Sequence, residues 1–349
     1  MNKKLPFMLL AAIILLLAAC GKDTKPPKKI EEQQKPDPSQ ENNQEEDEDN
    51  FAFRFPLTGN GTDNKPEERA VAVMINNHPL ARQQSGLSQA DVVYEVLAEG
   101  EVTRFLAIFQ SEKPDNIGPV RSARDYYIDL AQGYRALYIA HGYSPDAQKM
   151  LASGRYDQLN GMQHDGTLFK RAGFRKAPHN SYISFENIEK GAERQKYDMS
   201  VPPAPLEFMD AKEAEADLPG TPAPRVQVVY SGSKAFTNEY RYDENAGAYN
   251  RYSGGVQTEE YETKEPVRTE NLLVAAAVHK VIDNKGRRAI DFSSGGKAIL
   301  FQKGKAKELE WRNVEGRILP YENGAPAKLI PGKTWISIVP SLNSISYGE

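Results

Sequence analysis

Asp91-Val-Val-Tyr-Glu-Val-Leu-Ala98 is followed, after Glu99-Gly100, by Glu101-Val-Thr-Arg-Phe-Leu-Ala-Ile-Phe-Gln110, and these two stretches give the strongest indication of the fold. Both stretches are rich in β-branched and aromatic residues, and the junction is short and contains glycine. They therefore predict a β-hairpin. Further strands are expected at residues 70–75 (AVAVMI), which end at Asn76-Asn77-His78-Pro79, and at residues 136–140, which end at His141-Gly142-Tyr143.

Two helices are expected between and after these strands. Residues 121–132 carry Ala123, Tyr127, Leu130 and Ala131 at helical spacing, and Gly133 is a suitable stop. Ser144-Pro145-Asp146 predicts the start of a second helix, which runs to Ser153, because serine at the N-cap and proline at the first helical position favour helix initiation. Residues 51–195 are therefore expected to form a mixed α/β lobe around a central sheet.

The remainder of the chain predicts a second lobe. Residues 196–225 are rich in proline and are interpreted as a connection that contains one short amphipathic piece at 207–216. Residues 226–349 are expected to form a mainly β lobe, so the fold class is α+β. The strands expected there are residues 226–230, 238–243, 248–252, 272–282, 297–302, 307–312 and 334–340.

The amino-terminal residues indicate export and lipidation. Residues 1–19 combine Lys3 and Lys4 with an apolar run that is too short to span a membrane, and small residues precede Cys20. Because Cys20 is the only cysteine of the chain, we interpret residues 1–19 as a lipoprotein signal peptide and Cys20 as a diacylglyceryl cysteine. The alternative is an ordinary secretory signal with an incidental cysteine. The expected location is the extracytoplasmic face of the cell membrane.

Residues 20–50 are expected to form a disordered tether, because they contain almost no apolar side chain. Lysines lie near the lipid end and the acidic run EEDED lies at residues 45–49, which would hold the body away from an anionic membrane. A sequence-specific docking peptide is the alternative. The folded body is close to neutral and lacks the dense basic stripe of a nucleic-acid binder, so no nucleic-acid partner is expected.

The composition also limits the chemistry. Removal of the signal peptide and acylation of Cys20 leave no free thiol, which excludes thiol catalysis, iron–sulfur clusters and cysteine zinc sites. The five histidines show no metal-ligand spacing, and Gly295-Gly296 lacks a nucleotide-binding pattern. We therefore expect neither a metal nor a cofactor.

Several motifs resemble the YerB-like lipoproteins of Firmicutes. The resemblance rests on residues 90–95 (ADVVYE), 99–105 (EGEVTRF), 118–124 (GPVRSAR), 177–180 (APHN), 295–298 (GGKA) and 331–336 (PGKTWI). It covers residues ~55 to 345. It implies a two-part domain of unknown function in the cell envelope, and it supplies no catalytic residues.

The polar residues of the first lobe supply the candidate binding site. Arg121 and Arg124 are three residues apart in the expected helix, so we expect them to be neighbours on one helix face, where their guanidinium groups can grip a carboxylate or phosphate together. The alternative is structural pairing with Asp125, Asp129 or Glu99. The candidate anion-binding or ligand-binding residues are Arg104, Arg121, Arg124, Arg171, Arg175, His141 and Asn180.

Catalytic candidates are fewer. His179, on a loop after Pro178, has the residue type of an acid or base but equally that of a loop anchor. Ser144 is a better helix cap than nucleophile, and a Glu95–Glu99 carboxylate pair is a weaker possibility for glycoside cleavage. His179, Ser144 and Glu99 are the catalytic candidates. The sequence thus favours a non-catalytic binding or accessory protein for an envelope polymer or protein, with a peptidoglycan-active hydrolase or transferase as the alternative.

Overall fold

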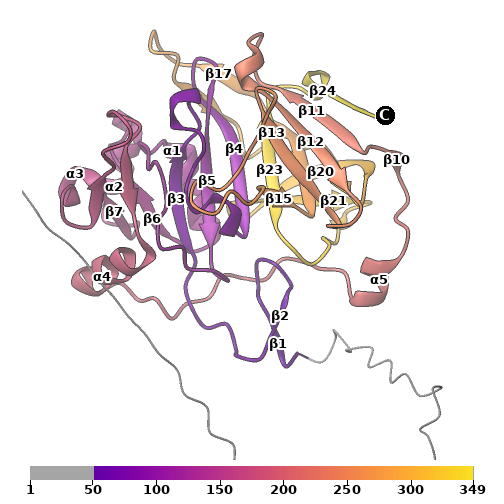
Figure 1. Ribbon diagram of the computed structural model, residues 1–349, viewed down its shortest axis with the longest axis horizontal. Helices are drawn as coiled ribbons and strands as arrows, with labels where there is room; N and C mark the ends of the chain where they lie inside the picture. The colour runs from indigo at the N-terminus through magenta and orange to yellow at the C-terminus, as the bar shows by residue number, and fades with distance from the viewer. Residues whose placement is uncertain (1–50, 349) are drawn as a thin grey trace, which may run out of the picture. The chain divides into compact units, whose positions relative to one another are not determined.

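The computed structural model describes residues 51–348, which are mostly β with few helices (Figure 1). The helices are α1 (Asp125–Gly133), α2 (Pro145–Ala152), α3 (Gly161–His164), α4 (Phe185–Gln195) and α5 (Ala211–Glu215). No helix among these residues has the length and apolar character needed to cross a membrane. The expected signal peptide, Cys20 and the tether lie outside the described residues.

The strands form two large sheets and three two-stranded ones. Those of the first half are β1 (Phe53–Arg54), β2 (Gly61–Thr62), β3 (Val71–Asn76), β4 (Val92–Glu99), β5 (Val102–Phe109), β6 (Leu137–Ala140), β7 (Gln158–Asn160), β8 (Phe169–Arg171) and β9 (Ser181–Ile183). Those of the second half are β10 (Thr221–Pro222), β11 (Arg225–Val229), β12 (Thr237–Asp243), β13 (Ala248–Ser253), β14 (Val256–Gln257), β15 (Arg268–Thr269), β16 (Asn271–Ala276), β17 (His279–Val281), β18 (Arg288–Ile290), β19 (Gly296–Gln302), β20 (Lys305–Val314), β21 (Arg317–Glu322), β22 (Ala325–Pro326), β23 (Thr334–Val339) and β24 (Ile345–Gly348).

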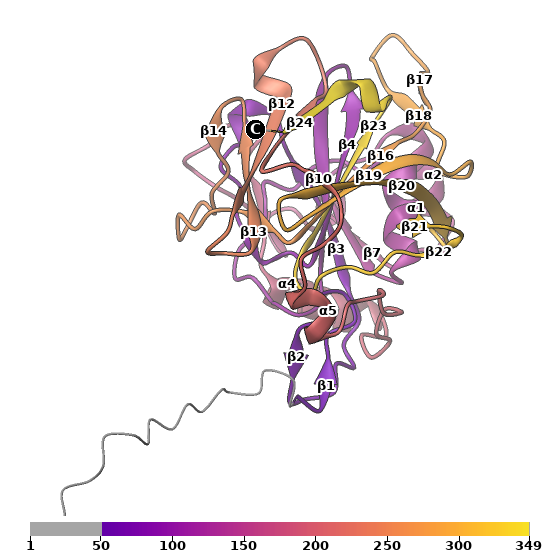
Figure 2. The ribbon, with the colours of Figure 1, turned by 90° about the vertical axis from the view of Figure 1, so that its right-hand side faces the viewer.

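The predicted hairpin lies at the centre of the larger sheet. This sheet has twelve strands, in the order β22-β21-β20-β19-β16-β23-β4-β5-β3-β6-β7, with β10 paired to β20. The parallel pairing of β4 with β23 joins strands of the two halves, which are purple and yellow in Figure 1. Figure 2 shows β16, β19 and β20 continuing this sheet. The structure fits a two-lobe arrangement, but both halves contribute to one continuous sheet.

Two hydrophobic clusters cover the two faces of the twelve-stranded sheet. On one face Val93 and Phe105 pack with Val226 and Tyr240 of the second, six-stranded sheet. On the other face Tyr94 and Leu106 pack with residues of α1 and α2. The strands β4 and β5 are buried on both faces, which explains why their sequence is a nearly continuous apolar run instead of a strict alternation.

Most of the expected elements are present. The hairpin, the strands at 70–75 and 136–140, the helix that Ser144 caps and the strands expected at 226–230, 238–243, 248–252, 297–302, 307–312 and 334–340 are confirmed within one or two residues at most ends, whereas β21 was not predicted. The expected strand 272–282 is divided into β16 and β17. The mixed α/β character of the first half is less pronounced than expected, because short strands and turns occupy much of it.

The expected helix at residues 121–132 begins late, at Asp125. Residues 120–123 are extended because they pair with two strand ends: Arg121 donates its backbone N–H to Met74, and Ala123 forms a bridge with Tyr143. Tertiary hydrogen bonds thus replace the first turn of the helix. The prediction that Arg121 and Arg124 share a helix face is therefore wrong.

Candidate functional site

Three neighbouring parallel strands end at one edge of the twelve-stranded sheet. Strands β3, β6 and β7 are mutually parallel, and they end at Asn76, Ala140 and Asn160. Open sheets of this kind bind ligands beyond the carboxyl ends of their parallel strands. The residues that follow these ends, together with the segment of Arg121 and the loop after β8, bring several basic side chains together.

His78 and His179 form a stacked pair at this edge. Their ring centroids are 4.7 Å apart and the ring planes differ by 23°. The Nδ2 atom of Asn76 lies 2.9 Å from Nδ1 of His179, and Nδ1 of His78 accepts a hydrogen bond from the backbone N–H of Leu80 at 3.2 Å. Each ring is therefore held through Nδ1, and its Nε2 atom has no hydrogen bond to another described residue.

His141 follows β6 and contacts two elements. Its Nδ1 atom lies 2.7 Å from Oγ of Ser181, and its Nε2 atom lies 2.9 Å from Nη2 of Arg171. Arg171 also donates to the carboxylate of Asp165 and to Oδ1 of Asn180. A Cβ atom at Gly161 would lie 2.1 Å from Nδ1 of His141, so only glycine fits at the turn after β7.

Arg121 is the least satisfied basic side chain at this edge. It is half-buried, and within residues 51–348 its guanidinium has no hydrogen bond or ion pair. Burial and the charge of Arg104 lower its pKa to about 10. The charged form is therefore disfavoured, and an anion would stabilise it. We name His78, Arg121, His141, Arg171 and His179 the histidine–arginine cluster.

The pKa values of the three histidines in the cluster are all lowered. Burial is the largest cause for each ring, and the positive charge of Arg121 contributes to all three. Arg82 adds to the effect at His78, Arg171 at His141, and His78 and Arg175 at His179, whereas Asp165 raises the pKa of His141. Cations therefore outnumber the carboxylates that act on these rings, so the cluster favours an anionic ligand.

The other predicted arginines have different partners. Arg104 donates to Oε2 of Glu99 at 2.7 Å and to the carbonyl of Ser122, and Arg124 forms an ion pair with Oε1 of Glu99. The structural pairing considered for Arg124 therefore occurs, with Glu99. Arg175 lies beside the cluster, but its guanidinium donates to the carbonyls of Ala81 and Gln83.

The predicted catalytic residues do not assemble. Ser144 caps α2, because its Oγ accepts from the N–H of Ala147 at 3.3 Å. A bulge between Leu97 and Glu99 turns Glu99 toward Arg104, on one face of the twelve-stranded sheet. Glu95 lies on the other face, toward the six-stranded sheet, so the two carboxylates cannot act as a pair across one substrate. Ser181, the serine that contacts His141, is only 1% exposed.

Sequence reasoning missed His78, Asn76, Ser181 and Asp165 as neighbours of the predicted residues. The useful signal was Asn76-Asn77-His78-Pro79 at the end of a predicted strand, because polar residues at carboxyl ends of parallel strands meet at one edge. The pairing order of β3, β6 and β7 is what brings them beside His141. Residues 51–348 contain no group of three His, Cys, Asp or Glu side chains suited to a metal ion.

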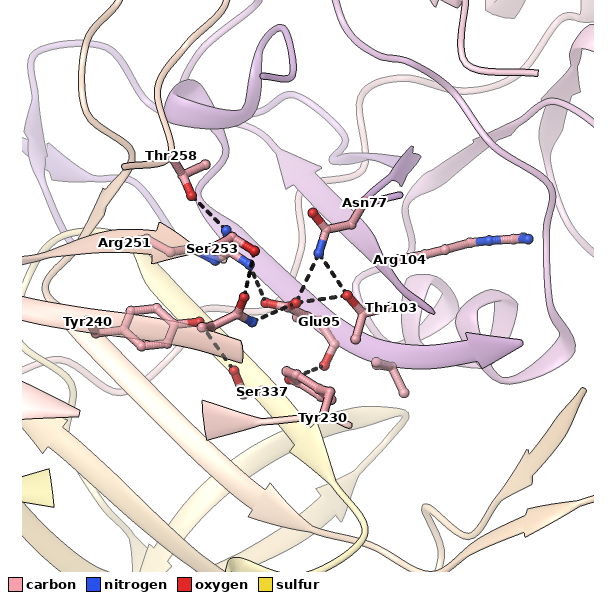
Figure 3. Close-up of polar contacts among 12 residues, drawn as sticks. Asn77, Glu95, Thr103, Arg104, Tyr230, Tyr240, Arg251, Ser253, Thr258 and Ser337 are labelled. Carbon is pink, nitrogen blue, oxygen red and sulfur yellow. Dashed lines mark hydrogen bonds and ion pairs between the residues drawn. The ribbon is translucent and has the colours of Figure 1, made fainter. Parts of the chain in front are cut away.

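A buried polar network supports the loop that carries His78. Oε1 of Glu95 accepts from Nδ2 of Asn77 at 3.1 Å and of Asn238 at 2.8 Å, while Oε2 accepts from Arg251 at 3.0 Å (Figure 3). Thr103 donates to the same carboxylate at 2.8 Å. Figure 3 shows Arg104 pointing away from this network.

Arg82 continues this connection between the halves. Its Nε atom donates to Oδ1 of Asn77 at 3.1 Å, and its Nη1 atom donates to the carbonyl of Ala235 at 2.9 Å. Burial, and to a smaller degree the charge of Arg251, lowers its pKa to about 10. The turn between β11 and β12, which contains Ala235, therefore helps to fix the loop that presents His78.

Two family models and a curated relative match most of residues 51–348. Residues 57–198 match the model described as protein of unknown function (DUF3048) N-terminal domain, and residues 226–336 match its C-terminal domain. A Bacillus subtilis (strain 168) protein named "Putative lipoprotein YerB" is 50% identical over 301 residues, which cover 84% of this chain and 89% of that protein. The crystal structure of YerB protein from Bacillus subtilis matches with a TM-score of 0.80 and 46% identity, covering 85% of this chain and all of that chain. The resemblance expected from the sequence motifs is thus confirmed, and the chain belongs to the DUF3048 family of proteins of unknown function.

Proposed function

We propose that this protein is an envelope lipoprotein, anchored through Cys20 on the extracytoplasmic face of the membrane, whose body binds an anionic envelope polymer or protein without catalysis. The histidine–arginine cluster is the binding site in this proposal. The name of the Bacillus subtilis relative supports membrane anchoring through lipid. Two acyl chains on one cysteine are enough for stable anchoring.

The observation that carries the proposal is the unpaired guanidinium of Arg121. A half-buried cation without a partner among the described residues loses hydration without compensation. Guanidinium groups recognise phosphate and carboxylate groups by paired hydrogen bonds. Because the charge of Arg121 acts on His78 and His179, an anion bound at Arg121 would also stabilise the protonated forms of these two rings.

Three features favour binding over catalysis. Ser181 is too buried to attack a polymer, and Nε2 of His141 faces the cation of Arg171. Glu99 is committed to two arginines. A nucleophile and a general base within hydrogen-bond reach of one substrate position would be needed for hydrolysis.

The test measures binding of the full chain in detergent micelles to isolated cell walls and to inorganic polyphosphate, which supplies the anionic group alone. Arg121→Gln is expected to weaken both interactions at least tenfold. Arg194→Gln, which removes a surface cation outside the cluster, is the matched control and should leave both unchanged. Equal binding by Arg121→Gln and the parent protein would reject the cluster as the site, and release of soluble wall fragments would favour the hydrolase alternative.

A further inference from the structure

A stacked pair of aromatic rings, exposed Phe174 and half-buried Tyr261, lies beside the histidine–arginine cluster. Phe174 is 55% exposed, which is unusual for a large apolar side chain. Its ring stacks on that of Tyr261 with centroids 4.8 Å apart and planes within 2° of parallel. The two residues belong to different halves of the chain.

This pair is held in place by the loop that leads away from His78. The backbone N–H of Tyr261 donates to the carbonyl of Gln84 at 2.8 Å. Arg175, next to Phe174, donates to the carbonyls of Ala81 and Gln83. Residues 81–84, which follow His78, therefore hold both rings by hydrogen bonds and fix their position relative to His78 before a ligand binds.

Phe174 remains more than half exposed although Tyr261 stacks on one face of its ring, so part of the ring surface is available to a ligand. The guanidinium carbon of Arg175 lies 5.3 Å from each of the two ring centroids, and equal distances place it beside the stack instead of over an outer face. Tyr182 contacts Phe174 at 6.0 Å with its plane tilted by 48°. Aromatic faces of this kind stack on the C–H faces of sugar rings.

Arg175 connects the two features. It lies at the edge of the aromatic pair, and its charge also contributes to the lowered pKa of His179, whose ring stacks on His78. Arg175 also donates to the carbonyl of Ala81, in the turn that His78 caps, so the aromatic pair lies next to the loop of the stacked histidines on which Arg121 acts. A ligand that uses both must carry an apolar ring face and an anionic group on adjoining units.

We propose that the ligand is a phosphate-bearing glycan, with one sugar ring on Phe174 and a neighbouring phosphate at Arg121. This inference rests on the proposed function and names its ligand class. Phosphate is favoured over carboxylate because it carries more negative charge and more acceptor oxygens, which suits a site with Arg121 and two histidine rings on which the charge of Arg121 acts. Inorganic polyphosphate would use the cationic part alone.

The test compares two probes of equal phosphate number with the full chain in detergent micelles. One is a synthetic phosphodiester-linked oligomer of N-acetylglucosamine, and the other is inorganic polyphosphate. The parent protein should bind the sugar oligomer about tenfold more tightly, and Phe174→Ala should remove this difference without weakening polyphosphate binding. Phe174→Tyr should retain it, because the ring face remains.

The outcomes separate this inference from the function on which it rests. Equal affinity of the parent protein for both probes, or a preference that survives Phe174→Ala, would overturn the glycan assignment and leave anion binding standing. Failure of Arg121→Gln to weaken either probe would overturn both. Val256→Ala, at a residue 64% exposed elsewhere on the six-stranded sheet, is the matched control and should change neither affinity.

Discussion

The carboxylate of Glu95 and the guanidinium of Arg251 form an ion pair of 3.0 Å in which each side chain is only 1% exposed. Glu95 belongs to β4 and Arg251 to β13, so the pair joins the twelve-stranded sheet to the six-stranded sheet. The guanidinium lies 4.7 Å from the ring centroid of Trp335 and 5.1 Å from that of Phe105. One carboxylate thus organises the contact between the sheets and also holds Asn77 beside the cluster.

Glu95→Gln is expected to lower the free energy of unfolding by about 3–5 kcal/mol, because it leaves the buried charge of Arg251 without a counter-ion. Urea unfolding measures the change. Lys190→Gln is the control, since it breaks an exposed ion pair with Glu186 on α4 and should cost less than about 1 kcal/mol. A loss at Glu95 no greater than that of the control would show that the buried pair does not stabilise the sheet contact.

Arg121→Gln is expected to raise the pKa values of His78, His141 and His179, because it removes a positive charge that acts on all three rings. Histidine NMR titration measures each ring. Arg194→Gln should raise only the pKa of His164, which is lowered by burial and by Arg194. If Arg121→Gln moves none of the three, Arg121 does not lie at the centre of the cluster.

The free energy of unfolding is expected to decrease on acidification, because three histidines of the histidine–arginine cluster have lowered pKa values. The folded-state pKa values of His78, His141 and His179 are below the ordinary value of about 6.5, so protons bind the unfolded chain more readily. Their contribution is fully present above about pH 6.5 and is lost as the pH falls through the folded-state values. Urea midpoints at pH 7.5 and pH 5.0 measure the loss.

A variant without one histidine separates the effect of that ring on stability from the effect of carboxylates, which also take up protons in acid. His179→Gln should show a smaller loss between the two pH values than the parent protein, and polyphosphate should reduce the loss in the parent protein by stabilising protonated rings. An identical loss in His179→Gln would exclude a contribution from this histidine.

Gly161→Ala is expected to destabilise the protein by about 1–3 kcal/mol and to weaken anion binding, because its Cβ would displace the ring of His141. Gly232→Ala is the control, since no atom lies within 4 Å of a Cβ built there. Thermal unfolding and polyphosphate binding measure the two effects. Unchanged binding would separate His141 from the site.

Under the proposed lipidation, Cys20→Ser is expected to lower the share of the protein in the membrane fraction, because serine lacks the thiol that carries the diacylglyceryl group. Fractionation of cells that express each form measures the distribution. Retention of Cys20→Ser in the membrane fraction would reject lipidation of this residue as the anchor.

The strands and the capped helix followed from local physics. The apolar runs of β4 and β5, the Asn-Asn-His-Pro end of β3 and the Ser144-Pro145 helix start are signals that neighbouring residues supply. The helix start at Asp125 was not predictable, because the extended backbone of Arg121 is fixed by hydrogen bonds with Met74 and His141, which are distant in sequence. The spacing of apolar residues along the chain carries no information about hydrogen bonds to distant segments that compete with helix formation.

Most strands and the family motifs could be recognised from the chain, since each depends on residues that are close together in it. The grouping of the polar residues depends on the tertiary fold. Parallel pairing of β3, β6 and β7 brings His78, His141 and Arg121 to one edge, while one bulge separates Glu95 from Glu99. The physical reason is that side-chain direction and strand order depend on long-range pairing, and a shift of one residue in a strand reverses the face on which a side chain lies.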